Sequence, residues 1–132
     1  MKKYLIIFMF MVVAATATFV FAGTADAFSI DRLVIAGSIE DREPVGVVGA
    51  FSGSTEKVYC FLDARDISDD TIVSFVWYLE EIEIARVELP IREGSRWRTY
   101  SSKKLAGNTG SWKVELQDEN GEVLETVEFR VE

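Results

Sequence analysis

The feature that most limits the fold of this chain is the spacing of its apolar residues, which has a period of two from Phe28 onward. In residues 71–79, every second position is apolar, at Val73, Phe75, Trp77 and Leu79. Successive side chains of a β-strand point to opposite faces, so this spacing gives each strand one apolar face. We find no convincing amphipathic-helix pattern in the same region. The body of the chain is therefore predicted to be all-β.

Turn-forming residues divide this region into about seven short strands. The predicted strands cover residues 30–39, 57–63, 71–79, 82–91, 95–102, 112–116 and 123–131. A turn or edge crossing is expected at residues 40–44, because Pro44 cannot lie in a central strand. Residues 66–70 are expected to form an acidic loop. A slip in the apolar phase at Ala85 and Arg86 predicts a bulge.

About seven strands in one domain are typical of an immunoglobulin-like antiparallel β-sandwich. The last two strands should form a hairpin, since Asn120 and Gly121 have the chemistry of a tight turn. A small β-barrel is the alternative fold, because alternation does not distinguish two packed sheets from one rolled sheet. All three tryptophans occupy inward positions, which predicts a structural core rather than a sugar-stacking platform: Trp77, Trp97 and Trp112.

Residues 1–27 have the pattern of a secretory signal peptide, and residues 28–132 form the domain. Lys2 and Lys3 precede an apolar run from Tyr4 to Ala22, and a small-residue cleavage site ends at Ala27. Cleavage after Ala22 is an alternative prediction. The run has 19 residues, so an uncleaved inner-membrane anchor is a further alternative. In each case the domain is expected to be exported, to the periplasm or the cell exterior.

Composition excludes several classes of function. After Ala27, 12 Lys and Arg residues stand against 21 Asp and Glu residues, a net charge of −9. Such a domain should bind no nucleic acid and should contact a membrane only through an uncleaved N-terminal segment. The chain has no histidine and one cysteine, Cys60, so we expect no metal site, no cofactor and no intramolecular disulfide. The domain is predicted not to be an enzyme.

Several short segments give the chain a resemblance to a known bacterial family. They are Asp41-Arg42-Glu43-Pro44, Val58-Tyr59-Cys60-Phe61, Val76-Trp77-Tyr78, Gly110-Ser111-Trp112 and, as the most specific one, Trp97-Arg98-Thr99-Tyr100-Ser101-Ser102-Lys103. Together they resemble the DUF2914 family. This resemblance implies an exported or membrane-associated domain of unknown function, with no catalytic residue to carry over. The family commonly has a histidine near the tryptophan–tyrosine pair, where this chain has Phe75.

Basic residues gather around one predicted strand, at residues 92–104. In this segment Arg96, Arg98 and Tyr100 alternate, so they should share one face of the strand. We predict that these three residues and Lys103 form a ligand-binding site for an anionic group, which arginine grips through paired donors. The alternative is that the arginines only pair across strands with acidic residues of the chain, namely Glu80, Glu81, Glu83 or Glu88.

Three other features are given structural or solvent-exposed roles. Cys60 alternates with apolar neighbours and is expected to be a buried thiol. Ser101 and Lys104 have the Ser-x-x-Lys spacing, but they lie at the end of a strand and not at a helix start. The acidic residues at 66–70 lack the order of a dedicated calcium loop.

The predicted function is that of a non-catalytic binding or interaction module of the bacterial cell envelope. Its partner is expected to be an envelope protein or an anionic glycan. One alternative is a carbohydrate- or peptidoglycan-binding domain, which would need an exposed aromatic ring. The other is an accessory domain of an envelope enzyme or a low-affinity calcium binder, which would need converging carboxylates.

Overall fold

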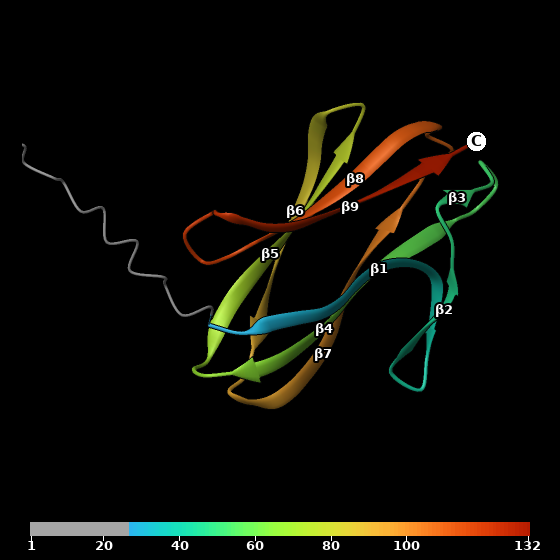
Figure 1. Ribbon diagram of the computed structural model, residues 1–132. Coiled ribbons are helices and arrows are strands. Elements are labelled where there is room, and N and C mark those ends of the chain that lie inside the picture. The colour runs from blue at the N-terminus through green and yellow to red at the C-terminus, as the bar shows by residue number, and fades with distance from the viewer. Residues whose placement is uncertain (1–26) are drawn as a thin grey trace, which may run out of the picture.

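The structure, a computed structural model, describes residues 27–132, and all regular structure in this part of the chain is β-strand. The strands are β1 (Ser29–Glu40), β2 (Glu43–Val47), β3 (Ala50–Phe51), β4 (Lys57–Ile67), β5 (Thr71–Leu79), β6 (Ile82–Ile91), β7 (Gly94–Lys104), β8 (Gly110–Gln117) and β9 (Val123–Val131). They form a four-stranded sheet, β2-β1-β4-β7, and a five-stranded sheet, β3-β9-β8-β5-β6. The two sheets pack against each other (Figure 1).

This arrangement confirms the predicted β-sandwich. Both sheets are open, so the chain forms two layers and not one closed sheet. The strand order β1-β4-β7 against β9-β8-β5 matches the order of the A-B-E and G-F-C strands in immunoglobulin domains. All strand pairs are antiparallel except β3 with β9.

The core lies between the sheets and contains two of the three tryptophans in fully inward positions. Trp77 is 0% exposed and Trp112 is 2% exposed. The Nε1–H of Trp77 on β5 donates to the Oγ of Ser101 on β7 at 3.0 Å, which joins the two sheets through a buried hydrogen bond. Trp97 also points inward but is only half-buried. Cys60, the only sulfur-bearing residue in the described region, is also buried in this core.

Some boundaries differ from the sequence prediction. Nine strands replace about seven, because β2 and β3 are short edge strands that carry little apolar signal. The strand predicted to end at residue 63 continues to Ile67, which is 3% exposed and pairs with Gly94 on β7, so the loop begins at Ser68. The predicted bulge is present: Trp77 pairs with Ala85 and the next β5 residue pairs with Glu83, so the extra residue is Ile84.

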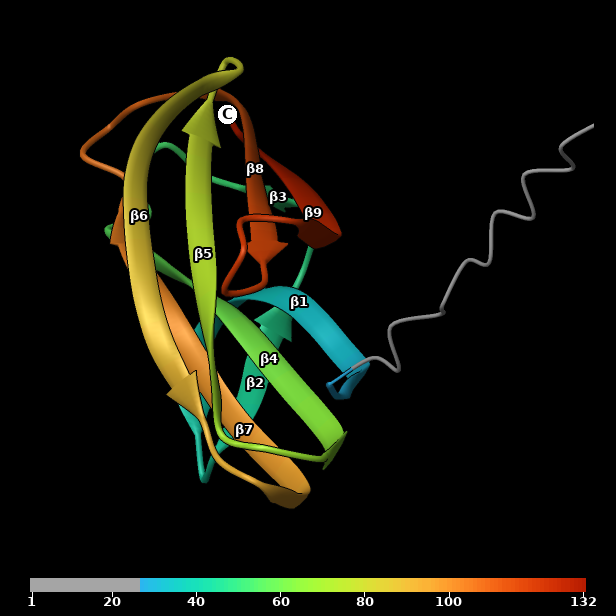
Figure 2. The same ribbon diagram turned by 90° about the vertical axis from the view of Figure 1, so that its left-hand side faces the viewer.

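The hairpin of β1 and β2 leaves the plane of its sheet and bends over the outer face of β4 and β7, as Figures 1 and 2 show. The contacts of Glu43 require this bend. Glu43 lies at the start of β2, on one edge of the four-stranded sheet, yet its carboxylate contacts Arg98 on β7, which is the opposite edge. The hairpin turn has Asp41 at φ 48° and Arg42 at φ 61°, both in the left-handed region.

The described region begins with a residue that is tied to the fold. The carbonyl oxygen of Ala27 accepts hydrogen bonds from the backbone N–H of Ser68 at 3.0 Å and from its Oγ at 3.1 Å. Phe28, the next residue, is buried. Across residues 27–132 no helix has the length and apolar character needed to cross a membrane. The predicted signal peptide lies almost entirely outside the described residues.

Candidate functional site

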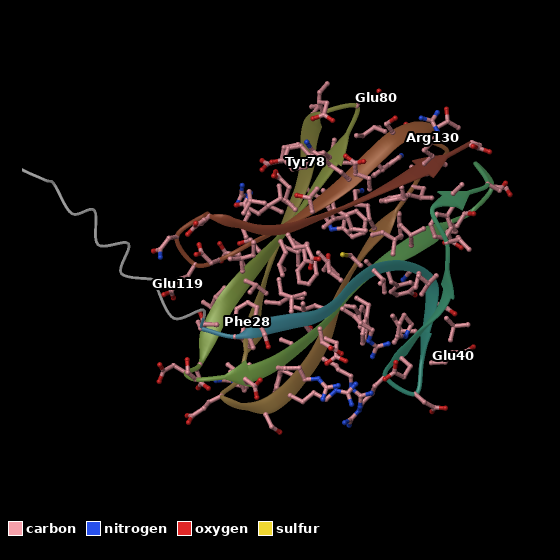
Figure 3. The ribbon with its side chains drawn as sticks, viewed as in Figure 1. Phe28, Glu40, Tyr78, Glu80, Glu119 and Arg130 are labelled. Atoms are coloured by element: carbon pink, nitrogen blue, oxygen red, sulfur yellow. The ribbon has the colours of Figure 1, made fainter. Side chains whose placement is uncertain are left out.

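Four arginines converge on the outer face of the four-stranded sheet. On β4, Cys60 and Leu62 point into the core, so Asp63 and Arg65 alternate outward. In the strand register, Asp63 lies opposite Arg32 on β1 and opposite Arg98 on β7. Arg65 lies opposite Arg96 on β7. We call the surface formed by Arg32, Arg65, Arg96 and Arg98 the arginine face. In Figure 3 nitrogen-bearing side chains gather between β7 and the hairpin that carries the labelled Glu40.

Asp63 lies at the centre of the arginine face. Its carboxylate accepts bonds from Arg96 Nε at 3.1 Å and Arg96 Nη2 at 2.8 Å, and from Arg32 Nη2 at 3.0 Å. Arg65 Nε lies 3.4 Å from it. The side chain of Asp63 is 0% exposed, because the guanidinium groups cover it. The hydrogen bonds from Arg96, followed by those from Arg32, lower the pKa of Asp63 to about 2. Asp63 is therefore ionised near neutral pH and anchors three cations.

The second carboxylate on this surface comes from the hairpin. Glu43 Oε2 lies 2.9 Å from Arg32 Nη1, and Glu43 Oε1 lies 2.7 Å from Arg98 Nη1 and 3.6 Å from Arg96 Nη2. The Glu43 side chain is 42% exposed, in contrast to Asp63. Hydrogen bonds, first from Arg32 and then from Arg98, hold the pKa of Glu43 below its ordinary value. A third carboxylate, that of Asp31, lies 3.6 Å from Arg65 Nη2 at the edge of the surface. Three carboxylates thus contact four guanidinium groups, and one positive charge remains in excess.

A cavity of about 300 Å³ opens between the hairpin and the arginine face. We call it the hairpin cavity, and it is lined by Ile39, Arg42, Phe61, Arg98, Thr99 and Tyr100. Arg42 forms no ion pair with another residue of the described region. Tyr100 is 47% exposed, and its ring meets that of Tyr59 edge to face at 5.5 Å. The cavity therefore combines guanidinium donors with aromatic walls.

The predicted site residues are brought together only in part. Arg96, Arg98 and Tyr100 do lie on one outer face, as the alternation predicted. Lys103 has the opposite parity, pairs with the core residue Val58 and donates from Nζ to the carbonyl oxygen of Lys104 at 3.3 Å. It therefore lies apart from the arginine face.

The ion-pair partners of the arginines also differ from the acidic residues named as the alternative. Those glutamates, Glu80, Glu81, Glu83 and Glu88, belong to β6 or to the turn before it, in the other sheet. The actual partners are Asp63 and Glu43. Sequence parity alone would have placed Arg32 and Asp63 outward, but the order of strands that makes them neighbours of β7 carries no local signal.

Other candidate groups have structural positions. Burial raises the pKa of the Cys60 thiol, and its side chain is 0% exposed. Ser101 is buried and accepts the bond from Trp77, while Lys104 points to the other side of β7. Among residues 27–132, no group of three or more His, Cys, Asp and Glu side chains is suited to hold a metal ion. A second cavity, of about 350 Å³, lies on the five-stranded sheet near Glu81, Ser111, Lys113 and Arg130.

The fold and the site together define an immunoglobulin-like β-sandwich with an arginine-rich outer sheet. Residues 70–131 match the family described as "Protein of unknown function (DUF2914)", which confirms the predicted resemblance over this part of the chain. The match covers β5 to β9 and includes Arg96 and Arg98. The hairpin and β4 lie before it, including the segments at residues 41–44 and 58–61.

No curated protein matches the chain. Among solved structures, the chain is similar to a β-glucosidase from Kluyveromyces marxianus, with 11% identity and a TM-score of 0.47 over 80% of this chain and 14% of the enzyme. A mutant β-glucosidase from Listeria innocua in complex with laminaribiose gives 8% identity and a TM-score of 0.48 over 80% of this chain and 16% of the enzyme. The chain thus spans about one seventh of these proteins, and the likeness is one of partial fold only.

Proposed function

We propose that this domain is a non-catalytic binding module of the cell envelope. Its arginines would hold an exported partner protein by binding the partner's carboxylates. The observation that carries the proposal is the convergence of four arginines on one outer sheet face, beside an open cavity. Arginine binds carboxylates through paired, charge-assisted hydrogen bonds, and it is the basic residue best suited to a partly desolvated contact.

The distribution of charge supports an acidic partner. Residues 29–47, 57–67 and 94–104, which build the four-stranded sheet, carry eight basic and six acidic residues. Residues 71–91 and 110–132, which build most of the other sheet, carry three basic and eleven acidic residues. Only the first sheet offers an attractive surface to an anion. A short acidic peptide segment would contact this surface without approaching the acidic one.

An anionic glycan is a second candidate partner, and one observation favours it. Tyr100 is 47% exposed and lies beside Arg98 in the hairpin cavity, so a sugar ring carrying a carboxylate would find both a stacking surface and a cation. Trp77 and Trp112 are buried in the core and offer no such surface. The protein partner is preferred because the cations outnumber the exposed rings on this face.

The proposal is tested by titrating the purified protein with a dye-labelled glutamate-rich peptide and following fluorescence anisotropy. Binding should be salt-sensitive and should be lost in Arg98→Ala. Arg86→Ala is the matched control, because this substitution removes the same charge. Arg86 lies on the other sheet and its side chain is 44% exposed. Equal binding by the two variants, or no binding by the wild type, would contradict the proposal. Preference for an oligouronate over the peptide would overturn the protein partner in favour of the glycan.

A further inference from the structure

We propose that Glu43 occupies the place at which a partner's carboxylate binds, so that the β1–β2 hairpin is an internal competitor for the arginine face. This inference rests on the proposed function and specifies its binding site. Two carboxylates contact both Arg32 and Arg96, and they differ in how readily a ligand could replace them. Asp63 belongs to the central strand β4, is 0% exposed and contacts three arginines. Glu43 is 42% exposed and reaches the arginines from a separate hairpin.

The hairpin is held to the arginine face mainly by these ion pairs. β2 is an edge strand of five residues and pairs only with β1. Its side chains Val45 and Val47 are 41% and 52% exposed, so neither is anchored in the buried core. Ion pairs that are open to solvent contribute little to stability, and an incoming carboxylate makes the same bonds. Exchange of Glu43 for a ligand carboxylate therefore needs no disruption of the core.

The hairpin cavity indicates what should accompany that carboxylate. Arg98 lies both in the cavity and 2.7 Å from Glu43, so the two sites are continuous. Phe61, Tyr100 and Ile39 supply apolar walls, and Arg42 supplies a further guanidinium group. The ligand class that fits is an acidic peptide in which a carboxylate is followed by an aromatic or large aliphatic side chain.

The test compares Glu43→Gln with Glu40→Gln in binding a dye-labelled peptide that contains glutamate next to phenylalanine. Glu40→Gln is the matched control, because this substitution removes the same charge. Glu40 lies opposite Glu43 in the strand register, across the same turn. If Glu43 is bound to the arginines in about nine tenths of the molecules, its removal should raise the apparent affinity for the peptide about tenfold. Glu40→Gln should change it much less.

The two proposals fail in different ways. Equal affinities for the Glu43→Gln and Glu40→Gln variants, or weaker binding by the former, would overturn the competitor role even if Arg98→Ala still abolishes binding. Loss of all Arg98 dependence would instead overturn the proposed function. A second measurement uses the wild type alone: backbone amide signals of the hairpin, at Asp41, Arg42 and Val45, should shift when the peptide is added. Unchanged hairpin signals under saturating peptide would also contradict the inference.

Discussion

Asp63 shows how one buried residue organises a surface. A carboxylate on the outer face of a sheet would ordinarily be exposed, but three guanidinium groups cover this one completely. Its ionised form is stabilised by the bonds from Arg96 and Arg32. In return it holds those side chains in place, so the positions of the cations are fixed before any ligand binds. Such preorganisation lowers the entropic cost of binding.

The stability of the protein should therefore depend on the charge of Asp63. Its folded pKa of about 2 is below the ordinary value of 3.8, so the stabilisation is complete above about pH 4 and is lost as the pH falls through 2. The shift corresponds to about 2 kcal/mol. Urea unfolding from pH 6 to pH 2 should show a gap between wild type and Asp63→Asn that closes on acidification. Asp31→Asn, at a carboxylate that is 51% exposed, should show little gap at any pH.

Trp112 is the residue on which the core prediction is most directly tested. It stacks on Phe129 at 5.7 Å between ring centroids, and its Nε1–H donates to the carbonyl oxygen of Asn108 at 3.1 Å. Trp112→Ala should lower the free energy of unfolding by about 3 to 5 kcal/mol, because a large buried ring is lost. Tyr100→Ala, at an exposed ring, should cost less than about 1 kcal/mol. Similar denaturant midpoints for these two variants would contradict the assignment of Trp112 to the core.

Two hairpins of the sandwich have turns whose non-glycine residues adopt a strained, left-handed backbone conformation. The β1–β2 turn and the β5–β6 turn each place two non-glycine residues at positive φ: Asp41, Arg42, Glu80 and Glu81. Two-residue hairpins favour Asn-Gly at such positions. At the β5–β6 turn the side chains compensate, since Glu80 Oε1 accepts from the Ser111 N–H at 2.8 Å and Glu81 pairs with Lys113 at 2.6 Å.

Replacing Asp41-Arg42 with Asn-Gly should stabilise the fold and weaken binding. We expect a gain of about 1 kcal/mol, because the left-handed strain is relieved, together with weaker peptide binding, because Arg42 leaves the hairpin cavity. Thermal melting and anisotropy measure the two effects. The same exchange at Glu80-Glu81 should gain less, since it removes two contacts. A loss of stability at the Asp41-Arg42 turn would show that contacts of the native turn residues outweigh its backbone strain.

The elements that sequence predicts well are those whose signal is local. The bounds predicted for β5 and β6 agree with the structure, because turn residues flank a regular alternation of apolar side chains. The short edge strand β2 and the end of β4 were missed, since each depends on a partner distant in sequence. The candidate site follows the same division. Arg96, Arg98 and Tyr100 share one strand, whereas Asp63 and Glu43 reach them only through strand order and the bend of the hairpin.

For the molecule as a whole, the stability should depend on whether the chain includes Ala27, which the predicted cleavage site would remove. Cleavage after Ala27 would remove the carbonyl oxygen that accepts both bonds from Ser68, whereas cleavage after Ala22 would keep it. A chain that begins at Gly23 should therefore be more stable than one that begins at Phe28, by about 1 kcal/mol, since water replaces the lost acceptor in part. Denaturant unfolding of the two chains measures the difference. Equal midpoints would show that these bonds contribute nothing.

The separation of charge between the two sheets has a kinetic consequence. One sheet of the sandwich carries a small excess of basic residues and the other a large excess of acidic residues, so charge is distributed unevenly across the two layers. The acidic partner proposed above would be attracted on one side and repelled on the other, which would rotate the pair toward a productive encounter. Such steering fades once salt shortens the screening length below the size of the domain. In dilute surroundings the partner would thus find the correct face quickly, even where the final complex is weak.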